Sequence, residues 1–268
     1  MTTHEGIRHH DAPPPIPDTV DPALRSQWDD LTAATPAPPA FDPGMLTGLP
    51  QPVRRWLTHA IAPGTPLRRS AVLHQQGQIK LGRWWRYRAD WALAPLSGFI
   101  WAARTSLGPV TIRGFDRYTR STGEMRWDLF GLVPFMRATG PDVTRSALGR
   151  LAAELCFVPA AALAAELVWS PVDDHRATAA VTVDGSTSRL TITVADTGTL
   201  TRVDVPRWGQ PGGTAFGEHL FTAVLDGPER DFDGYTIPVT GRAGWWHCPD
   251  GCASEEFIRF SIDQAHYR

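Results

Sequence analysis

The chain has 268 residues, with 26 basic against 28 acidic side chains and a formal net charge of −2. That length suits one large β domain or two small domains, with a core that needs no disulfide framework. The balanced charge argues against a nucleic-acid surface, and three cysteines in so long a chain argue against a disulfide-rich scaffold. No apolar run is as long as the ~18 residues of a membrane-spanning helix, and the first 20 residues contain no apolar signal segment. We therefore expect a cytoplasmic protein without a membrane span.

Residues 1–43 form a proline-rich segment that holds nine of the 24 prolines. Such stretches stay extended or disordered. Between the proline clusters, residues 21–34 have the pattern of a short helix with an apolar face around Trp28. We expect an N-terminal arm at 1–43 and a single domain at 44–268. Deleting residues 1–40 is expected to leave the melting temperature within a few degrees, roughly the effect of 1 kcal/mol.

Two further segments have the helical period of apolar residues. Residues 49–62 carry an apolar face that includes Val53 and Trp56, with prolines at the start and Pro63-Gly64 at the end. Residues 145–166 carry an apolar stripe that includes Leu151, and Pro159 is expected to break this run into two helices.

From about residue 68 most of the chain alternates between apolar and polar residues, which is the pattern of strands with one buried face. Asp184-Gly185 is a strong hairpin signal among the turns that join these strands. We count about 11 strands and two principal helices. The sequence thus predicts an α+β fold, in which a long antiparallel meander curls into a half-barrel or open barrel around the helices.

Six motifs resemble those of a bacterial family of unknown function: LPQPVRRWLTHA, GFIWAAR, RSALGRLAAELCFVPAAAL, VWSPVDDHRATAAV, LTRVDV and DFDGYTIPVTGRAGW. The likeness runs from about residue 49 to residue 265. It implies a fold similar to that of bacterial lipoprotein carriers (LolA/LolB-like), an antiparallel half-barrel around helices that encloses an apolar cavity. It implies no activity, since the same half-barrel serves both lipid carriers and a cofactor-free pigment-pathway enzyme. The sequence departs from the family in its long arm and at residues 247–252.

The cysteines give no metal site. His247, Cys248 and Cys252 are three soft ligands close together, but a structural zinc site needs four and no partner pair exists. A hairpin turn at 249–251 is the simpler interpretation, and we expect no metal and no cofactor. Cys156 lies on an apolar helical face, where a buried structural thiol is the ordinary case.

Three polar residues are candidates for acid–base chemistry. Asp116 and Tyr118 lie two residues apart on a predicted strand and therefore share a face. A carboxylate beside indole rings is poorly solvated, so its pKa should rise and make Asp116 a usable base, with Tyr118 orienting the substrate. His219 is the second choice for proton transfer. A purely structural hydrogen bond is the alternative for the Asp116–Tyr118 pair.

The eleven tryptophans are the most unusual feature of the composition. Rings on strands usually fill a core, but seven such tryptophans exceed what a two-helix core needs. Some are therefore expected to line an apolar ligand cavity between the sheet and the helices. The candidate ligand-binding residues are Trp85, Trp101, Trp127, Tyr235 and Trp245. The arginines at 86, 88, 104 and 126 then lie on the solvated face; with the sheet inverted, they would line an anion-binding trough instead.

These observations support two hypotheses. In the first, a half-barrel binds an apolar or aromatic small molecule. In the second, the same cavity belongs to a cofactor-independent enzyme, a cyclase, isomerase or hydrolase acting on a hydrophobic biosynthetic intermediate. No nucleic-acid partner is expected. The residues fix neither the ligand, the reaction nor the oligomeric state.

Overall fold

A long antiparallel sheet dominates the computed structural model, which describes residues 15–213, 215–246 and 254–268. Within these residues, 13 strands form one sheet in the order β6-β5-β4-β3-β2-β1-β15-β14-β11-β10-β9-β8-β7, and two more form a separate hairpin. The strands of the first half are β1 (Ala71–Leu81), β2 (Arg83–Ala94), β3 (Gly98–Leu107), β4 (Val110–Thr119), β5 (Thr122–Leu129) and β6 (Val133–Thr139). Those of the second half are β7 (Leu167–Pro171), β8 (Arg176–Val183), β9 (Ser186–Val194), β10 (Leu200–Gly209), β11 (Gly217–Val224), β14 (Thr240–Trp246) and β15 (Ser254–Tyr267), with β12 (Glu229–Phe232) and β13 (Tyr235–Pro238) as the separate hairpin.

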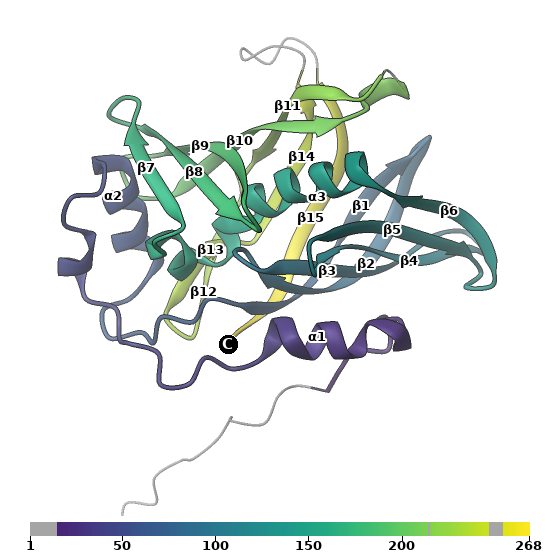
Figure 1. The fold of residues 1–268 in the computed structure, drawn as a ribbon, viewed down its shortest axis with the longest axis horizontal. Helices are drawn as coiled ribbons and strands as arrows, with labels where there is room; N and C mark the ends of the chain where they lie inside the picture. The colour runs from purple at the N-terminus through teal and green to yellow at the C-terminus, as the bar shows by residue number, and fades with distance from the viewer. Residues whose placement is uncertain (1–14, 214, 247–253) are drawn as a thin grey trace, which may run out of the picture.

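The sheet curls around a helix, as Figure 1 shows. That helix, α3 (Pro141–Ala153), runs through the hollow side of the sheet and contacts strands of both halves, chiefly β5 and β10. The two halves of the sheet meet at the pairing of β1 with β15, where Ala71 lies opposite Tyr267. The predicted α+β fold, a meander curled into a half-barrel around helices, is confirmed.

Alternation along the strands sets which side chains face the hollow. On β2 the residues Tyr87, Ala89 and Trp91 are buried, while the adjacent Arg86 and Arg88 are exposed. These two arginines thus lie on the outer, solvated face of the sheet. This is the first of the two orientations considered above, and not the inverted one in which the arginines would line an anion-binding trough. On β3 both faces are buried, because another helix covers the outside of this strand.

The remaining helices are short. They are α1 (Arg25–Thr32), α2 (Gln51–Ala60) and the 3₁₀ turns η1 (Pro22–Leu24), η2 (Pro43–Leu46), η3 (Glu154–Phe157), η4 (Pro159–Leu163) and η5 (Pro211–Gly213). Helix α2 buries its predicted apolar face, including Val53 and Trp56. Pro159 breaks the helical run as expected, and the second helix is the short 3₁₀ helix η4 of five residues. The chain turns extended at Ala164 and enters β7 at Leu167.

Residues 16–31 of the N-terminal arm pack against the outer face of the sheet. Helix α1 lies along β2 and β3 (Figure 1), and Trp28 is only 2% exposed. Trp28 belongs to an apolar cluster completed by Val20, Leu24, Leu31, Val72, Ala92, Ala94, Ile100, Ala102 and Phe115. The expectation that residues 1–40 contribute little to folding is therefore wrong for this stretch. The short helix predicted at 21–34 is present as α1, and its apolar face covers apolar side chains on the outer face of β3.

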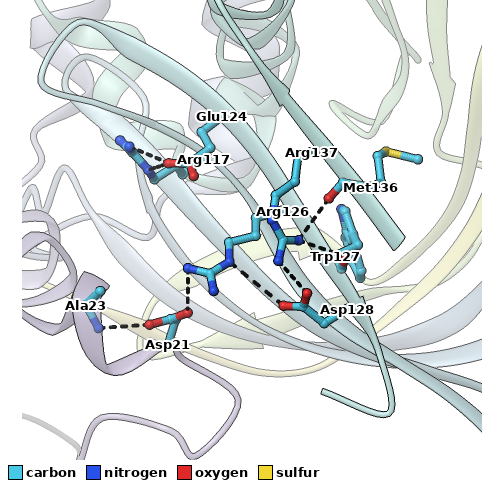
Figure 2. A network of polar contacts seen from close by, with 9 residues as sticks. All are labelled: Asp21, Ala23, Arg117, Glu124, Arg126, Trp127, Asp128, Met136 and Arg137. Atoms are coloured by element: carbon cyan, nitrogen blue, oxygen red, sulfur yellow. Dashed lines mark hydrogen bonds and ion pairs between the residues drawn. The ribbon is translucent and has the colours of Figure 1, made fainter. Parts of the chain in front are cut away.

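Polar contacts also hold this arm to the sheet. Asp21 accepts a hydrogen bond from the backbone N–H of Ala23 over 2.9 Å and so caps η1. The same carboxylate lies 3.6 Å from the Arg126 guanidinium on β5 (Figure 2). Arg126 in turn lies 3.8 Å from Asp128. The arm is thus tied to β5 by a chain of charges as well as by the cluster around Trp28.

The hairpin of β5 and β6 ends the sheet with an exposed apolar tip. Leu132 is 84% exposed, and Phe130, Val133 and Phe135 are more than half exposed. The sequence analysis missed β6, because no buried face creates an alternating pattern there. Arg137 fastens this strand by donating to Asp128 and to the carbonyl oxygens of Trp127 and Met136 (Figure 2). No helix among the described residues is long and apolar enough to cross a bilayer.

Candidate ligand-binding cavity

A cavity of about 630 Å³ lies between α3 and the hollow side of the sheet. Strands from both halves form its walls, and α3 forms its inner side. Most of the lining is apolar and much of it aromatic: Ile79, Trp91, Phe99, Trp101, Met125, Phe157, Phe221, Trp245, Phe257, Ile258 and Phe260. A smaller pocket of about 80 Å³ adjoins it, shares Trp101 and Asp116 with it, and is also lined by Trp127. The size of the larger cavity lies in the range of small-molecule sites.

Three charged residues form a network on the wall of this cavity. Arg150, on α3, donates from Nη1 to Asp116 Oδ2 on β4 over 2.9 Å and from Nε to Glu154 Oε1 over 2.6 Å. The other carboxylate oxygen of Asp116 accepts from the indole N–H of Trp127 over 2.9 Å. The guanidinium of Arg150 also lies 4.5 Å from the ring centre of Phe99. Arg150 thus links the helix to the sheet and serves two carboxyl groups at once.

Burial shapes the protonation of these groups. It raises the pKa of Asp116 and of Glu154 above their ordinary values, and the nearby Arg150 only partly offsets this. For Arg150 burial acts to lower the pKa, but the two carboxylates outweigh it and the net shift is upward. The second oxygen of Glu154, Oε2, is buried without a hydrogen-bond partner among the described residues. A protonated Glu154 would present a hydrogen-bond donor at this position.

A second arginine, Arg207, reaches the cavity from β10. Its Nε donates to the carbonyl oxygen of Ser146 on α3 over 3.0 Å. Its guanidinium lies 5.0 Å from the ring centre of Phe221 and 5.2 Å from that of Trp245. In the described part of the chain no carboxylate lies within 4.0 Å of it, and neither terminal nitrogen makes a hydrogen bond. Burial, with a smaller repulsion from Arg150, lowers the pKa of Arg207 to about 10, so it is a cation at neutral pH.

A buried glutamine fixes two of the rings. Gln75 Oε1, on β1, accepts from the hydroxyl of Tyr87 and from the indole N–H of Trp101, each over 3.0 Å. The rings of Tyr87 and Trp101 meet edge to face with centres 5.4 Å apart. Burial raises the pKa of the Tyr87 hydroxyl, which therefore stays protonated and donating. Gln75 thus holds the Trp101 indole in place where it lines the cavity.

The sequence profile of DUF6544, described as a family of unknown function, matches residues 39–254. The chain belongs to this family. The family expected from the six motifs, one of unknown function, is thereby confirmed. Among curated proteins, none matches the sequence of this DUF6544 member.

Two solved structures are similar to the DUF6544 chain. One is a LolA superfamily protein from Nitrosomonas europaea, with 9% sequence identity, a TM-score of 0.43, and coverage of 81% of this chain and 92% of that chain. The other is a putative outer membrane lipoprotein-sorting protein domain from Vibrio parahaemolyticus, with 8% identity, a TM-score of 0.41, and coverage of 74% and 85%.

The ligand-binding residues expected from the sequence divide into two groups in this DUF6544 structure. Trp101 and Trp245 line the large cavity, and Trp127 lines the smaller pocket beside it. Trp85 packs at the edge of the core outside both linings. Tyr235 also lies outside them, on β13, where its ring stacks on Tyr267 with centres 4.0 Å apart.

The three candidate acid–base residues are not brought together. Asp116 lines the cavity, and burial shifts its pKa in the expected direction. Tyr118 instead donates its hydroxyl to Asp184 over 2.7 Å, in the turn between β8 and β9. His219 lies with its ring centre 6.3 Å from that of Trp245, outside the lining. Buried Cys156 does line the cavity, and burial raises its pKa, which keeps it a thiol.

The sequence analysis missed Arg150, Glu154 and Arg207, although each left a signal. Arg150 and Glu154 lie four residues apart on the face of the helix that also carries Ala147. Arg207 follows Val203 and Val205 at the period of a strand, so it falls on their buried face. A charge that interrupts an apolar face is the sign of a buried polar site.

His247, Cys248 and Cys252 lie outside the described residues. Within the described ranges no group of three or more histidine, cysteine, aspartate or glutamate side chains is placed to hold a metal ion.

Proposed function

We propose that this DUF6544 protein binds an apolar or aromatic small molecule in the cavity between α3 and the curled sheet. The observation that carries the proposal is the cavity itself, about 630 Å³ in volume and lined mainly by aromatic and aliphatic side chains. Sites for small molecules have this size and this composition, with a few polar groups that fix orientation. Arg150 and Arg207 supply such polar groups here.

The alternative, a cofactor-independent enzyme, has less support from the same residues. Of the three residues predicted for acid–base chemistry, Asp116 alone lines the cavity. The hydrogen bonds that Asp116 accepts from Trp127 and Arg150 stabilise its ionised form and so weaken it as a base. The Tyr118 hydroxyl is engaged by Asp184 as well. These contacts favour binding over catalysis.

A titration with N-phenyl-1-naphthylamine, a neutral aromatic dye that fluoresces in apolar surroundings, tests the proposal. We expect saturable binding to the wild-type protein. The variant Ala243→Phe places a ring where a small side chain lines the cavity, and we expect it to weaken binding at least about tenfold, or 1.4 kcal/mol.

The matched control is Ala34→Phe, the same substitution at an exposed position. It should bind the dye as the wild type does. Ala147→Phe fills the cavity from the side of α3 and should also weaken dye binding. Agreement between the two variants would show that the loss in Ala243→Phe does not come from a local distortion of β14. Absence of saturable binding to the wild type, or undiminished binding in both cavity variants that remain folded, would rule the proposal out.

A further inference from the structure

Arg207 is a cation in a mainly apolar cavity, and none of the described carboxylates lies within 4.0 Å of it. Its single described hydrogen bond uses Nε and the Ser146 carbonyl oxygen, and the terminal nitrogens of its guanidinium donate to no described residue. The rings of Phe221 and Trp245 flank it. A guanidinium presents its terminal N–H groups as a fork that matches a carboxylate. Desolvating this fork without a partner is costly, so an anion supplied from outside would be held strongly.

The other charges of the cavity do not supply that anion. Arg150 takes up both carboxyl groups, one from Asp116 and one from Glu154. Arg117 is likewise paired, with Glu124 at 2.6 Å. Both carboxyl groups are hydrogen-bonded to Arg150, and neither lies within 4.0 Å of Arg207, so the Arg207 guanidinium has no direct ion-pair partner among the described residues.

Two buried polar atoms of the lining residues also lack a hydrogen-bond partner among the described residues. Glu154 Oε2 and the indole N–H of Trp91 make no hydrogen bond to any described residue. Buried polar atoms in folded proteins are normally hydrogen-bonded, so orphaned ones in a cavity wall point to a ligand or to water. Polar groups here are few, while the rings of Phe99, Trp101 and Phe260 supply a broad apolar surface.

We propose that the ligand is an amphiphile with a single carboxylate, that Arg207 pairs with this carboxylate, and that the apolar body of the ligand lies against the aromatic wall. This inference rests on the proposed function and specifies its ligand class. Lys80 also lines the cavity but is exposed to solvent, so Arg207 is the cation beside the aromatic wall that calls for one negative charge. A cavity of this volume takes an aliphatic or aromatic body about the size of a medium-chain fatty acid.

The test uses displacement of N-phenyl-1-naphthylamine by dodecanoate and by 1-dodecanol, which share the same tail. We expect the wild type to bind dodecanoate at least about tenfold more tightly than the alcohol, since hydrogen bonds to a charged group contribute about 1.5–3 kcal/mol. Arg207→Met should weaken dodecanoate binding at least about tenfold, while binding of 1-dodecanol should change less than about threefold.

Arg145→Met is the matched control, because Arg145, on α3, is 57% exposed and lies outside the lining. It should leave both affinities unchanged. Arg207→Lys keeps the charge without the fork, and we expect it to recover part of the preference for dodecanoate.

The outcomes separate the two proposals. If the dye itself does not bind the wild type, the proposed function fails and this inference falls with it. If the dye binds but the acid and the alcohol compete equally, or if Arg207→Met weakens both alike, the carboxylate pairing is overturned while the cavity's binding role stands. If Arg207→Met does not fold, the preference of the wild type for dodecanoate over 1-dodecanol, compared with that of Arg207→Lys, tests the carboxylate pairing instead.

Discussion

Arg150 on α3 donates to Asp116 on β4 over 2.9 Å, and this ion pair spans the boundary between the inner helix and the sheet. Both side chains are 17% exposed, so water screens the pair little. Since the same guanidinium also bonds Glu154, the helix is held to the sheet through one cation with two acceptors. The packing of α3 and the polarity of the cavity therefore depend on the same residue.

Removing that cation should destabilise the fold strongly. Arg150→Met leaves two buried carboxyl groups without their partner, and breaking a buried pair from one side costs about 3–5 kcal/mol. Urea denaturation of the variant measures the loss. Adding Asp116→Asn to Arg150→Met should recover part of it, because one of the stranded charges is then gone. Equal stability of Arg150→Met and wild type would mean that the pair contributes nothing to the fold.

The arm should contribute to folding through one side chain in particular. Trp28→Ala empties a site that is 2% exposed between α1 and the sheet, and truncation of a buried tryptophan costs about 3–5 kcal/mol. Thermal unfolding measures the change. Leu132→Ala is the control, since that side chain is 84% exposed and its loss should stay within about 0.5 kcal/mol. If the two variants melt alike, the arm is not part of the packed structure.

Gln75 offers a test of how the cavity rings are held. Gln75→Leu removes the acceptor of two buried donors, Tyr87 Oη and Trp101 Nε1, and each unpaired donor costs about 1–3 kcal/mol. Tyr87→Phe in the same background deletes one of those donors and should restore part of the lost stability. Chemical denaturation of the single and double variants gives the coupling. Strict additivity of the two substitutions contradicts this account.

Stability should also depend on pH through Glu154. Burial raises the pKa of its carboxyl above the ordinary value of about 4.3. Between these two values the folded state holds a proton that the unfolded state has released, so the free energy of unfolding falls as pH rises through this window. Glu154→Gln removes the effect and keeps an oxygen for Arg150. The wild type should therefore lose stability relative to the variant as pH rises above about 4. Urea denaturation measures the free energy of unfolding of both proteins across this pH range. If the wild type keeps its stability relative to Glu154→Gln, or gains stability relative to it, as pH rises, the predicted sign is wrong.

Local patterns predicted the strands well where one face is buried. In β2, the alternation of apolar and polar residues matches the burial of Tyr87, Ala89 and Trp91. In β3, the same period places Trp101 on the hollow side of the sheet. Alternation failed for β6, which has no buried face, and it did not reveal that α1 covers the outside of β3. What covers a surface depends on segments far away in the chain, and a single strand's pattern does not contain that information.

The candidate site shows the same division. Trp101 and Trp245 of the cavity wall were predicted from the number of tryptophans and Asp116 from its position on a strand, whereas Trp91 was not predicted to line the cavity. The partners of Asp116 were not, because Arg150 lies 34 residues away on a helix. A strand period assigns a face to a side chain but does not say which other element will pack on that face.

The pairing of β1 with β15 has a consequence for how the chain folds. Strands β1 to β6 join neighbours in sequence, as do β7 to β11, so both groups can assemble from local hairpins. The continuous sheet requires the pairing of β1 with β15, in which Ala71 lies opposite Tyr267, about three quarters of the 268-residue chain away. Closing so long a loop is entropically costly and slow. On the ribosome, the first group of strands must therefore wait with an unpaired edge on β1 until the last strand has been synthesised, and only then can the continuous sheet form.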